Sequence, residues 1–275
     1  MHISNLSNTN LEDIVFAILM AFDGYFVTMP SDVAYWSNRF QCARVDWEYS
    51  YGMFDKDNNL IGFIINGIDY IGGDLVAFNT GTGVISKYRG QRIVDQLYQY
   101  ALPLLKIRGI SICALEVIQK NDRAVHVYKR IGFSIAKSYR CFKGKLPLSL
   151  YQTSIKAVDL ETIKTAPQHF YAWDNVNAAL LKASKGIYEC YEVLNKGETV
   201  GFFVVNPISG HLPQFEIYNT QEPKHWALIF DGIAQCTRNV SINNVNAQRT
   251  VLVEQLEALN LTNSINQYEM ELRIG

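Results

Sequence analysis

The sequence predicts an α+β fold, in which a mixed, mostly antiparallel sheet is flanked by helices and followed by a second, smaller lobe. Two observations lead to this fold class. The hydrophobic pattern of the first 145 residues indicates two helices, a set of antiparallel strands and then strand–helix–strand–helix–strand, which is an α+β order. A weaker version of part of this pattern returns 128 residues later and indicates an internal duplication.

The first elements follow from capping residues and hydrophobic periodicity. Asn10 to Phe22 and Ser31 to Ala43 are predicted as helices, because each begins with a residue that caps helices well and continues with helical spacing of apolar residues. Trp47 to Phe54 alternates like a strand. After a cluster of turn-forming residues, Leu60 to Asn66 is the returning strand.

The next elements alternate between strand and helix. Leu75 to Ser86 is predicted as a third strand, although Gly81 and Gly83 weaken or bend it. Beyond it the predictions are a helix that contains Ile93 and ends at Gly109, an apolar strand at Ile110 to Ile118, an amphipathic helix at Asn121 to Ile131 and a strand at Phe133 to Phe142.

The second half repeats parts of the first. Leu60 to Phe63 recurs as Thr199 to Phe202, and the helix at Asn121 to Ile131 has a counterpart at Arg249 to Leu259. Chance similarity between amphipathic elements is the alternative, but order and spacing favour a duplication. We therefore predict two domains, at residues 1–145 and 150–275, joined by a linker at Lys143 to Ser149, with a final strand at Gln267 to Ile274.

Composition narrows the class of protein. No apolar run reaches the roughly 20 residues that cross a bilayer, and the apolar stretch near the start follows acidic residues rather than the basic start of a signal peptide. A cytoplasmic location is therefore expected. The five cysteines are widely spaced and none lies at metal-ligand spacing, so we predict small buried hydrophobes and neither disulfides nor a metal site.

The net charge of −1 hides a segregation of charges along the chain. Residues 1–85 carry a net charge of −7, residues 86–145 carry +10 and residues 146–275 carry −4. A basic block in a near-neutral chain suggests a polyanionic ligand, although a solvated basic face is an alternative. Nucleic acid is not expected, because the block contains no nucleic-acid motif and the chain as a whole is not basic.

A glycine-containing basic loop lies inside this block. The strand that ends near Val84 runs into Arg89-Gly90-Gln91-Arg92, and a helix begins at Ile93. Backbone N–H groups at a helix start are unpaired and lie at the positive end of the helix dipole. Such a loop suits a pyrophosphate, and Arg89 and Arg92 would add charge-assisted contacts.

A second motif follows about 30 residues later: Leu115-Glu116-Val117, then Asn121, Tyr128 and Gly132-Phe133. With this motif the chain resembles the GNAT superfamily of acetyl-CoA-dependent N-acetyltransferases. That superfamily combines a strand, a Q/R-x-x-G-x-G/A loop, a helix, another strand and a helix bearing Asn and Tyr. The match is clear over residues 84–133, and it extends by element order over residues 10–143. The second half resembles a degenerate second copy, as in a tandem GNAT protein.

The resemblance implies acetyl-CoA as cosubstrate and a role for each matching position. The loop from Arg89 to Val94 would hold the pyrophosphate, the strand from Gly83 to Ile85 would pair with the pantetheine arm, and Asn121 would contact that arm. The implied cofactor-binding residues are Gly83, Val84, Ile85, Arg89, Gly90, Gln91, Arg92, Ile93, Val94 and Asn121.

The resemblance also implies that Tyr128 protonates the departing thiolate. Thiol and phenol have pKa values of about 8.5 and 10, so a phenol supplies that proton at little cost. Glu116 is a candidate base for the attacking amine, and the alternative is a structural carboxylate. Without the surrounding motif, Tyr128 would be read as a core aromatic residue. His126 has no Ser or Cys nucleophile to pair with, so an acyl-enzyme is not expected.

Two departures from the superfamily pattern affect the loop. Arg92 stands at a glycine position, and Val94 stands where Gly or Ala is usual. Small residues there let the backbone approach the phosphates closely. In the second half, Arg249 replaces the Asn and Leu256 replaces the Tyr, so a second catalytic site is not expected.

The function implied is transfer of an acetyl group to a primary amine of a small molecule or peptide by direct attack, with no nucleic-acid or membrane partner. The substrate-binding segment is predicted at Phe22 to Arg44, where Tyr25, Tyr35 and Trp36 could line a pocket or belong to the core. The alternative function is a catalytically silent acyl-CoA-binding or interaction module, suggested by the altered loop and the degenerate second copy.

Overall fold

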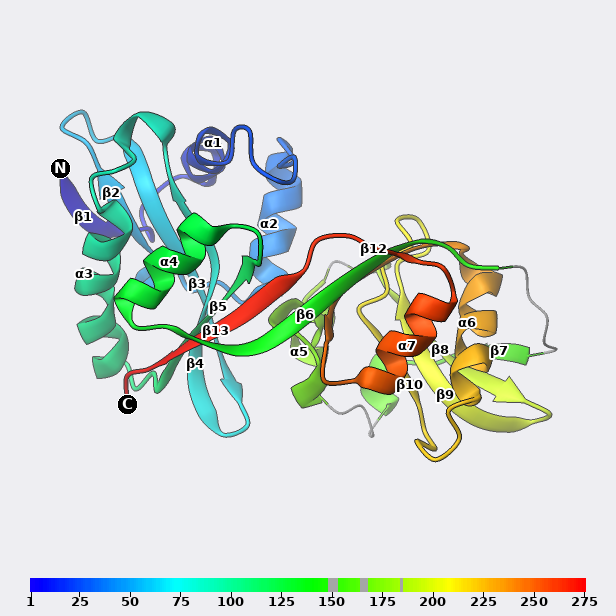
Figure 1. Ribbon diagram of the computed structural model, residues 1–275. Helices are drawn as coiled ribbons and strands as arrows, with labels where there is room; N and C mark the ends of the chain where they lie inside the picture. Colours follow the sequence, from blue (N-terminus) through cyan, green and yellow to red (C-terminus); the bar gives the residue numbers. More distant parts are fainter. Residues whose placement is uncertain (148–152, 164–167, 184) are drawn as a thin grey trace. The chain divides into compact units, whose positions relative to one another are not determined.

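The computed structural model describes residues 1–147, 153–163, 168–183 and 185–275. The chain folds into two compact units (Figure 1). The first unit comprises Met1–Val117, Asn121–Ala136 and Glu269–Gly275, and the second comprises Ile118–Lys120 and Lys137–Tyr268. Among the helices described, none is long and apolar enough to cross a membrane.

From β1 to β5, the sheet of the first unit is antiparallel except at one strand pair. Neighbouring strands run antiparallel from β1 to β4, and β4 then pairs in parallel with β5. This is the mixed, mostly antiparallel sheet expected from the sequence. Its strands are β1 (His2–Asn5), β2 (Tyr51–Phe54), β3 (Leu60–Ile71), β4 (Asp74–Val84) and β5 (Ile112–Ile118).

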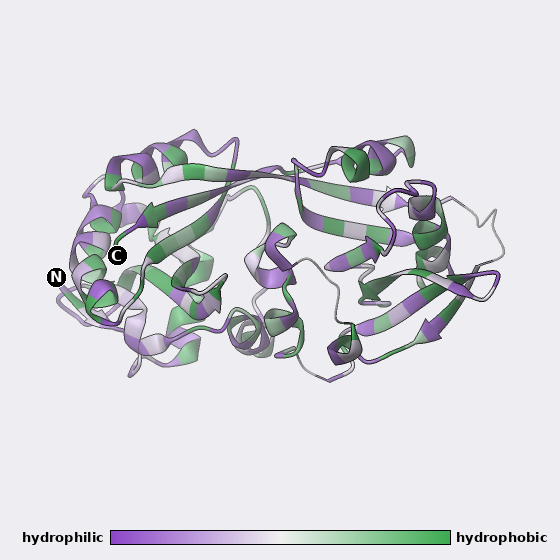
Figure 2. Ribbon diagram, turned by 90° about the horizontal axis from the view of Figure 1, so that it is seen from below, coloured by the Kyte–Doolittle hydropathy of each residue, from purple (hydrophilic) through white to green (hydrophobic). Residues whose placement is uncertain are grey.

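Four helices accompany this sheet, as expected. They are α1 (Leu11–Ala21), α2 (Val33–Cys42), α3 (Ile93–Ile107) and α4 (Asp122–Ile131). Helices α1 and α2 bury Phe63 and Ile65 of β3 in one hydrophobic core, and α3 packs on β2, β3 and β4. Figure 2 shows hydrophobic residues interspersed with hydrophilic ones along strands and helices, which is the pattern that one-sided burial produces.

Two local predictions in this unit are wrong. The N-cap of α2 is Asp32 rather than Ser31, because the Asp32 carboxylate accepts a hydrogen bond of 3.0 Å from the Ala34 N–H. The segment that starts at Trp47 is not strand throughout: Trp47–Tyr49 forms a short 3-10 helix, capped by the Asp46 carboxylate, before β2 begins.

The last strand of the chain, β13 (Gln267–Arg273), lies between β5 and β6 (Ser134–Lys145) in the sheet order. The Ile274 N–H donates to the Ser111 carbonyl at 2.9 Å, and Met270 is fully buried. The bounds of the first unit therefore differ from the predicted 1–145. Strand β6 also continues to Lys145, inside the predicted linker, whereas Leu148 and Ser149 of that linker lie outside the described residues.

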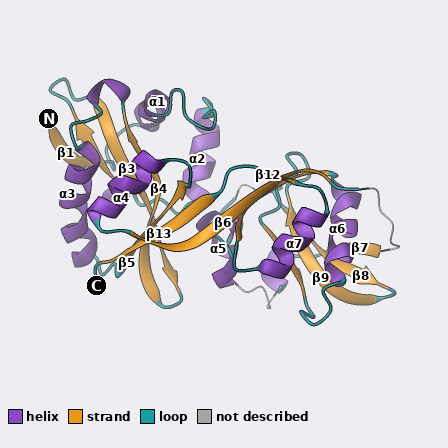
Figure 3. Ribbon diagram, viewed as in Figure 1, coloured by secondary structure: helices purple, strands orange, loops and turns teal. Residues whose placement is uncertain are grey.

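The second unit has its own four-stranded antiparallel sheet (Figure 3). The strand order is β10-β9-β8-β7, and its helices are α5 to α7. The elements are β7 (Thr153–Ala157), α5 (Asn177–Leu180), β8 (Glu189–Asn195), β9 (Glu198–Val205), β10 (Gln214–Ile217), α6 (His225–Cys236), β11 (Asn239–Asn246), α7 (Thr250–Ala258) and β12 (Thr262–Asn263).

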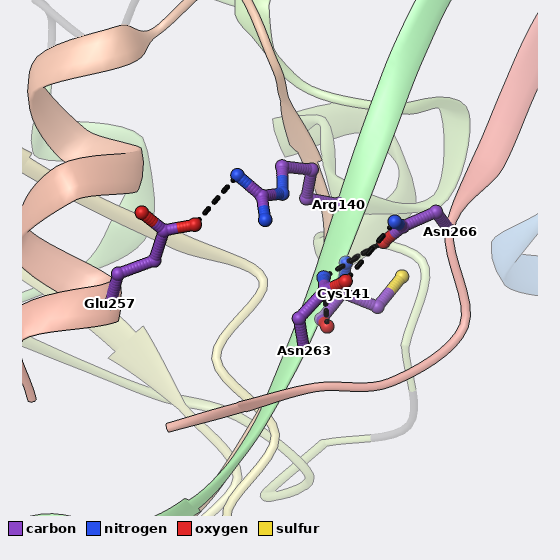
Figure 4. Close-up of polar contacts among 5 residues, drawn as sticks. All are labelled: Arg140, Cys141, Glu257, Asn263 and Asn266. Atoms are coloured by element: carbon purple, nitrogen blue, oxygen red, sulfur yellow. Dashed lines mark hydrogen bonds and ion pairs between the residues drawn. The ribbon is translucent and has the colours of Figure 1, made fainter. Parts of the chain in front are cut away.

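Polar contacts tie the second half of β6 to the chain around α7 and β12 (Figure 4). Arg140 forms an ion pair of 2.7 Å with Glu257 of α7. The Cys141 carbonyl accepts a hydrogen bond from the Asn263 amide at 3.1 Å, and Asn263 and Asn266 exchange side-chain hydrogen bonds of 2.8 and 3.1 Å. These contacts fix the segment that precedes β13.

Geometry supports the predicted internal duplication. Asn121 and Arg249, the residues before α4 and α7, have nearly the same backbone angles: φ −89° and ψ 65° against φ −81° and ψ 62°. Gly62 of β3 lies opposite Val84, and Gly201 of β9 lies opposite Ile217, so each glycine sits at the end of the corresponding strand pair.

The cysteines are not all buried as predicted. Cys113, Cys141 and Cys190 are buried, whereas Cys42 and Cys236 are half-buried. Burial raises the pKa of the Cys113 and Cys190 thiols to about 12, so both stay protonated at neutral pH.

Candidate active site

A break in the sheet creates the main cavity of the first unit. The parallel pairing of β4 with β5 runs from Val76 to Asn79. Thr80 then forms a β-bulge, because Asn79 and Gly81 face consecutive residues of β3. Beyond the bulge, the last residues of β4 and Glu116 of β5 line opposite parts of a cavity of about 860 Å³.

The cavity brings together most of the residues predicted from the sequence. Ten of the twelve line it: Gly83, Val84, Arg89, Gly90, Arg92, Ile93, Val94, Glu116, Asn121 and Tyr128. The other two are not among the lining residues. Ile85 is buried and its N–H donates to the Ile61 carbonyl, while the exposed Gln91 uses its carbonyl to accept a hydrogen bond from Gln96.

The start of α3 forms one end of the cavity. Arg92 is the N-cap and adopts a left-handed conformation with φ 54° and ψ 33°, and Gly90 has φ 82°. The backbone therefore takes a conformation that suits glycine even though position 92 is arginine. The N–H groups of Ile93, Val94 and Asp95 belong to the first turn, where helices leave donors unpaired.

Arg89 is engaged with the protein backbone. Its guanidinium donates to the Val84 carbonyl at 3.1 Å and to the Ala21 carbonyl at 2.8 Å. The side chain thus links the end of β4 to the end of α1, and both segments line the cavity. Sequence reasoning assigned Arg89 to phosphate binding from its charge and did not anticipate this link.

Tyr128 lies on α4 with 8% of its surface exposed and lines the cavity. Burial raises the pKa of its phenol to about 12, and a hydrogen bond with Thr82 partly opposes the shift. The Thr82 hydroxyl donates to the Asn79 side-chain carbonyl at 2.8 Å, and Asn79 donates to Asn66 at 3.5 Å. Tyr128 is therefore neutral at physiological pH.

The acidic residues of the cavity differ in their surroundings. Asp95 forms a two-pronged ion pair with Arg130, with distances of 2.8 and 2.7 Å, and the Arg130 hydrogen bonds lower the pKa of that carboxyl. Glu116 is half-buried on β5, beyond the point where β4 and β5 stop pairing. The third acidic lining residue, Asp122, lies in the first turn of α4, so Glu116 is the one that lies on a strand of the cavity wall.

Asn121 has two contacts in the protein itself. Its side-chain oxygen accepts from the Ala124 N–H at 3.2 Å, which caps α4, and its amide donates to the Tyr25 hydroxyl at 3.3 Å. Tyr25 lines the cavity, whereas Tyr35 is exposed and Trp36 is buried, and neither is among the lining residues.

Sequence reasoning missed Thr82 and the neighbouring Thr80. Thr82 is adjacent to Gly83. It contacts Asn79, three residues earlier, because the bulge at Thr80 interrupts the regular alternation of side chains along β4. Because a bulge shifts which side chains share a face, a period of two cannot identify them. His126 is exposed and is also among the residues that line the cavity.

The second unit has a cavity of about 700 Å³ beside the counterpart strand and helices. Glu216 of β10 and Arg249 form a largely buried ion pair of 2.6 Å in its wall. The Tyr171 hydroxyl donates to Glu216 at 2.6 Å, and the Arg249 guanidinium lies over Phe170 and Trp226. Arg249, which precedes α7 as Asn121 precedes α4, is thus paired with Glu216 of the same unit.

Comparisons with known proteins agree with this geometry. Residues 16–133 match the acetyltransferase (GNAT) family. No curated protein matches the chain. The family match includes all the residues that line the first cavity.

Solved structures resemble the chain over nearly its full length. A protein from Pyrococcus horikoshii described as an acetyltransferase has a TM-score of 0.70 and 14% identity, over 99% of this chain and 89% of that one. A GCN5-related N-acetyltransferase from Sphaerobacter thermophilus has a TM-score of 0.71 and 9% identity, over 99% and 95%. A tandem GNAT protein from the clavulanic acid biosynthesis pathway has a TM-score of 0.67 and 10% identity, over 100% and 98%. Such low identities show a shared fold, with function still to be argued from the site.

Proposed function

We propose that this chain, which belongs to the GNAT acetyltransferase superfamily, transfers an acetyl group from acetyl-CoA to a primary amine of a small molecule or peptide. The observation that carries the proposal is the cavity at the parted strands, which gathers the start of α3, the edge of β4, Glu116 and Tyr128 in the first unit. Acetyl-CoA would supply an acetyl group activated as a thioester.

The residues present fit a pyrophosphate-bearing cosubstrate. The first turn of α3 offers N–H donors at the positive end of the helix dipole, and Arg92 and Arg123 line the cavity with charges of the right sign. The backbone of β4 from Thr80 to Val84 also lines it, past the last pairing with β5. This edge of β4 beyond its pairing with β5 suits the amide groups of a pantetheine arm, which would add to the sheet as a strand does.

Tyr128 is proposed as the general acid. A pKa of about 12 keeps its phenol protonated, so the hydroxyl is available as a donor at any pH where the protein works. The same value makes complete proton release costlier than for a free phenol. The phenolate form therefore needs stabilisation from its surroundings as the proton leaves.

Glu116 is proposed as the base that takes the proton from the attacking amine, directly or through a water. It faces the cavity from β5, while Asp95 is held by Arg130. A carboxylate on this wall would also favour the approach of a cationic amine, which must lose a proton before it attacks.

The test is an acetylation assay with a panel of small amines and peptides, with release of the CoA thiol as readout. The wild type is expected to turn over at least one amine, and Tyr128→Phe is expected to lower kcat by 10²- to 10³-fold with little change in KM for acetyl-CoA. If Tyr128→Phe keeps full kcat, Tyr128 is not the acid. If acetyl-CoA binds in a calorimeter but no amine is acetylated, the silent-module alternative replaces the enzyme.

A further inference from the structure

Tyr98 is a buried ionisable residue that the proposed chemistry does not yet use. It lies on α3 with 2% of its surface exposed. Its ring meets the Tyr128 ring edge to face, with centroids 6.4 Å apart and planes at 88°, and meets the Phe133 ring at 5.4 Å. Tyr98 thus packs against the ring of the proposed acid.

The Tyr98 hydroxyl has no hydrogen bond of acceptable geometry among the described residues. A buried hydroxyl without a partner is costly, and such groups in native proteins usually have a role beyond packing. The groups that face it are Tyr128 from α4, Cys113 from β5 and Thr82 from β4. Burial, followed by Tyr128 and Cys113, raises the pKa of Tyr98, and Thr82 lowers it slightly. Tyr98 therefore keeps its proton.

The Thr82 hydroxyl donates its proton to another partner in this structure. A threonine hydroxyl has one proton, and that of Thr82 is given to the Asn79 carbonyl at 2.8 Å. Asn79 is itself held by Asn66, whose amide donates to the Tyr49 carbonyl at 2.6 Å. This chain of donors runs away from Tyr128, and the Thr82 proton is directed at Asn79.

We infer that Tyr98 is a positioning residue for the reaction, whose hydroxyl donates a hydrogen bond to the Tyr128 oxygen as Tyr128 loses its proton. The inference rests on the proposed acetyl transfer through Tyr128. Tyr98 has an uncommitted O–H and its ring packs against the Tyr128 ring, and a buried phenolate is stabilised by a nearby hydrogen-bond donor.

The proton balance is simple. The amine nitrogen forms a bond to the acetyl carbon, the carbon–sulfur bond breaks, and the sulfur receives the proton of Tyr128. The amine gives up one proton to Glu116 or to water, and Tyr128 regains one from solvent before the next turnover. Tyr98 keeps its own proton throughout and gains the Tyr128 oxygen as its hydrogen-bond acceptor.

The experiment compares four full-length variants: Tyr98→Phe, Tyr128→Phe, the double variant and Tyr100→Phe. Tyr100 is the matched control, since it lies on the same helix but is 44% exposed and packs on Tyr51. Release of the CoA thiol from acetyl-CoA is followed with the best amine of the panel and, without amine, with water as acceptor. Thermal unfolding is measured on every variant.

Tyr98→Phe is expected to lower kcat about tenfold and to change KM for acetyl-CoA less than twofold, since the hydroxyl acts only as the thiolate leaves. Its unfolding temperature is expected to be unchanged or higher, because an unpartnered hydroxyl is removed. The double variant is expected to match Tyr128→Phe, because Tyr98 acts only through Tyr128. Tyr100→Phe should behave as wild type.

The outcomes separate the two proposals. If Tyr98→Phe keeps full kcat while Tyr128→Phe loses activity, the role of Tyr98 is overturned and the proposed function stands. A fall in kcat that comes with a lower unfolding temperature would also overturn it, since packing would then explain the loss. If Tyr128→Phe is fully active, or if the wild type releases no thiol, the proposed function fails first.

Discussion

Arg92 holds a left-handed backbone conformation at the start of α3, where glycine would be unstrained. For an arginine this conformation costs about 1 kcal/mol. Arg92→Gly is therefore expected to raise the free energy of unfolding by up to about 1 kcal/mol, the gain being limited by the added freedom of glycine in the unfolded chain. The same change removes a cation from the cavity and should weaken acetyl-CoA binding several-fold at low salt.

Arg92→Lys is the matched control, because it keeps both the charge and the strained backbone. Its stability and its acetyl-CoA affinity should stay close to those of the wild type, as measured by urea unfolding and calorimetry. Tighter binding by Arg92→Gly than by the wild type would mean that close backbone approach matters more than the arginine charge.

Tyr128 makes a pH prediction with a definite sign. Its pKa is about 12 in the folded protein and about 10 in an unfolded chain. The folded state therefore binds more protons between these values, and the contribution of Tyr128 to stability is complete below pH 10 and lost as pH rises toward 12. When the pH is raised from 9 to 11, the free energy of unfolding should fall for the wild type by about 1 kcal/mol more than for Tyr128→Phe, as measured by urea unfolding. An equal loss in both proteins would contradict the raised pKa.

At the scale of elements, the end of β4 depends on one glycine for its close packing. A Cβ added at Gly83 would lie 2.5 Å from the Phe63 ring and 2.8 Å from the Ala21 Cβ. Gly83→Ala is expected to destabilise the protein by about 1–3 kcal/mol and to raise KM for acetyl-CoA, because α1 or β4 must move.

Gly81 is the control on the same strand. The nearest atom to an added Cβ is 3.8 Å away, on Ile65, which is ordinary contact. Gly81→Ala should change the free energy of unfolding by less than about 0.5 kcal/mol, measured side by side with Gly83→Ala. Equal destabilisation by the two changes would mean that β4 is sensitive to any side chain there.

The order of elements could be predicted from the sequence, but their local geometry could not. The Arg89 to Val94 loop and the Asn121 cap were recognised because residue type alone signals a strand-to-helix turn and a cap. The bulge at Thr80 carries no such signal, since it depends on the pairing with β3. The link from Arg89 to the Ala21 carbonyl joins residues 68 positions apart, which no local pattern reveals.

At the scale of the whole molecule, β13 shows that a strand's position in the sequence does not decide which unit it joins. Periodicity predicted a final strand at Gln267 to Ile274, and a strand is found at Gln267–Arg273. Periodicity cannot say which sheet a strand joins, because that choice is made by long-range pairing. Residues Glu269–Gly275 belong to the first unit, so the sheet that carries the cavity is completed by residues from the far end of the chain.

This arrangement predicts that the first unit cannot keep its site without β13. Removal of residues 267–275 takes out the fully buried Met270 and the strand next to β5. Loss of one buried methionine alone is worth about 2–5 kcal/mol, so the shortened protein should unfold at a much lower temperature and lose acetyl-CoA binding. Every cavity-lining residue is nevertheless still present.

A synthetic peptide of residues 267–275 should restore binding when added to the shortened protein, because the vacated position offers unpaired backbone groups on both sides. Unchanged acetyl-CoA affinity after the removal, measured by calorimetry, would show that β13 is dispensable for the site.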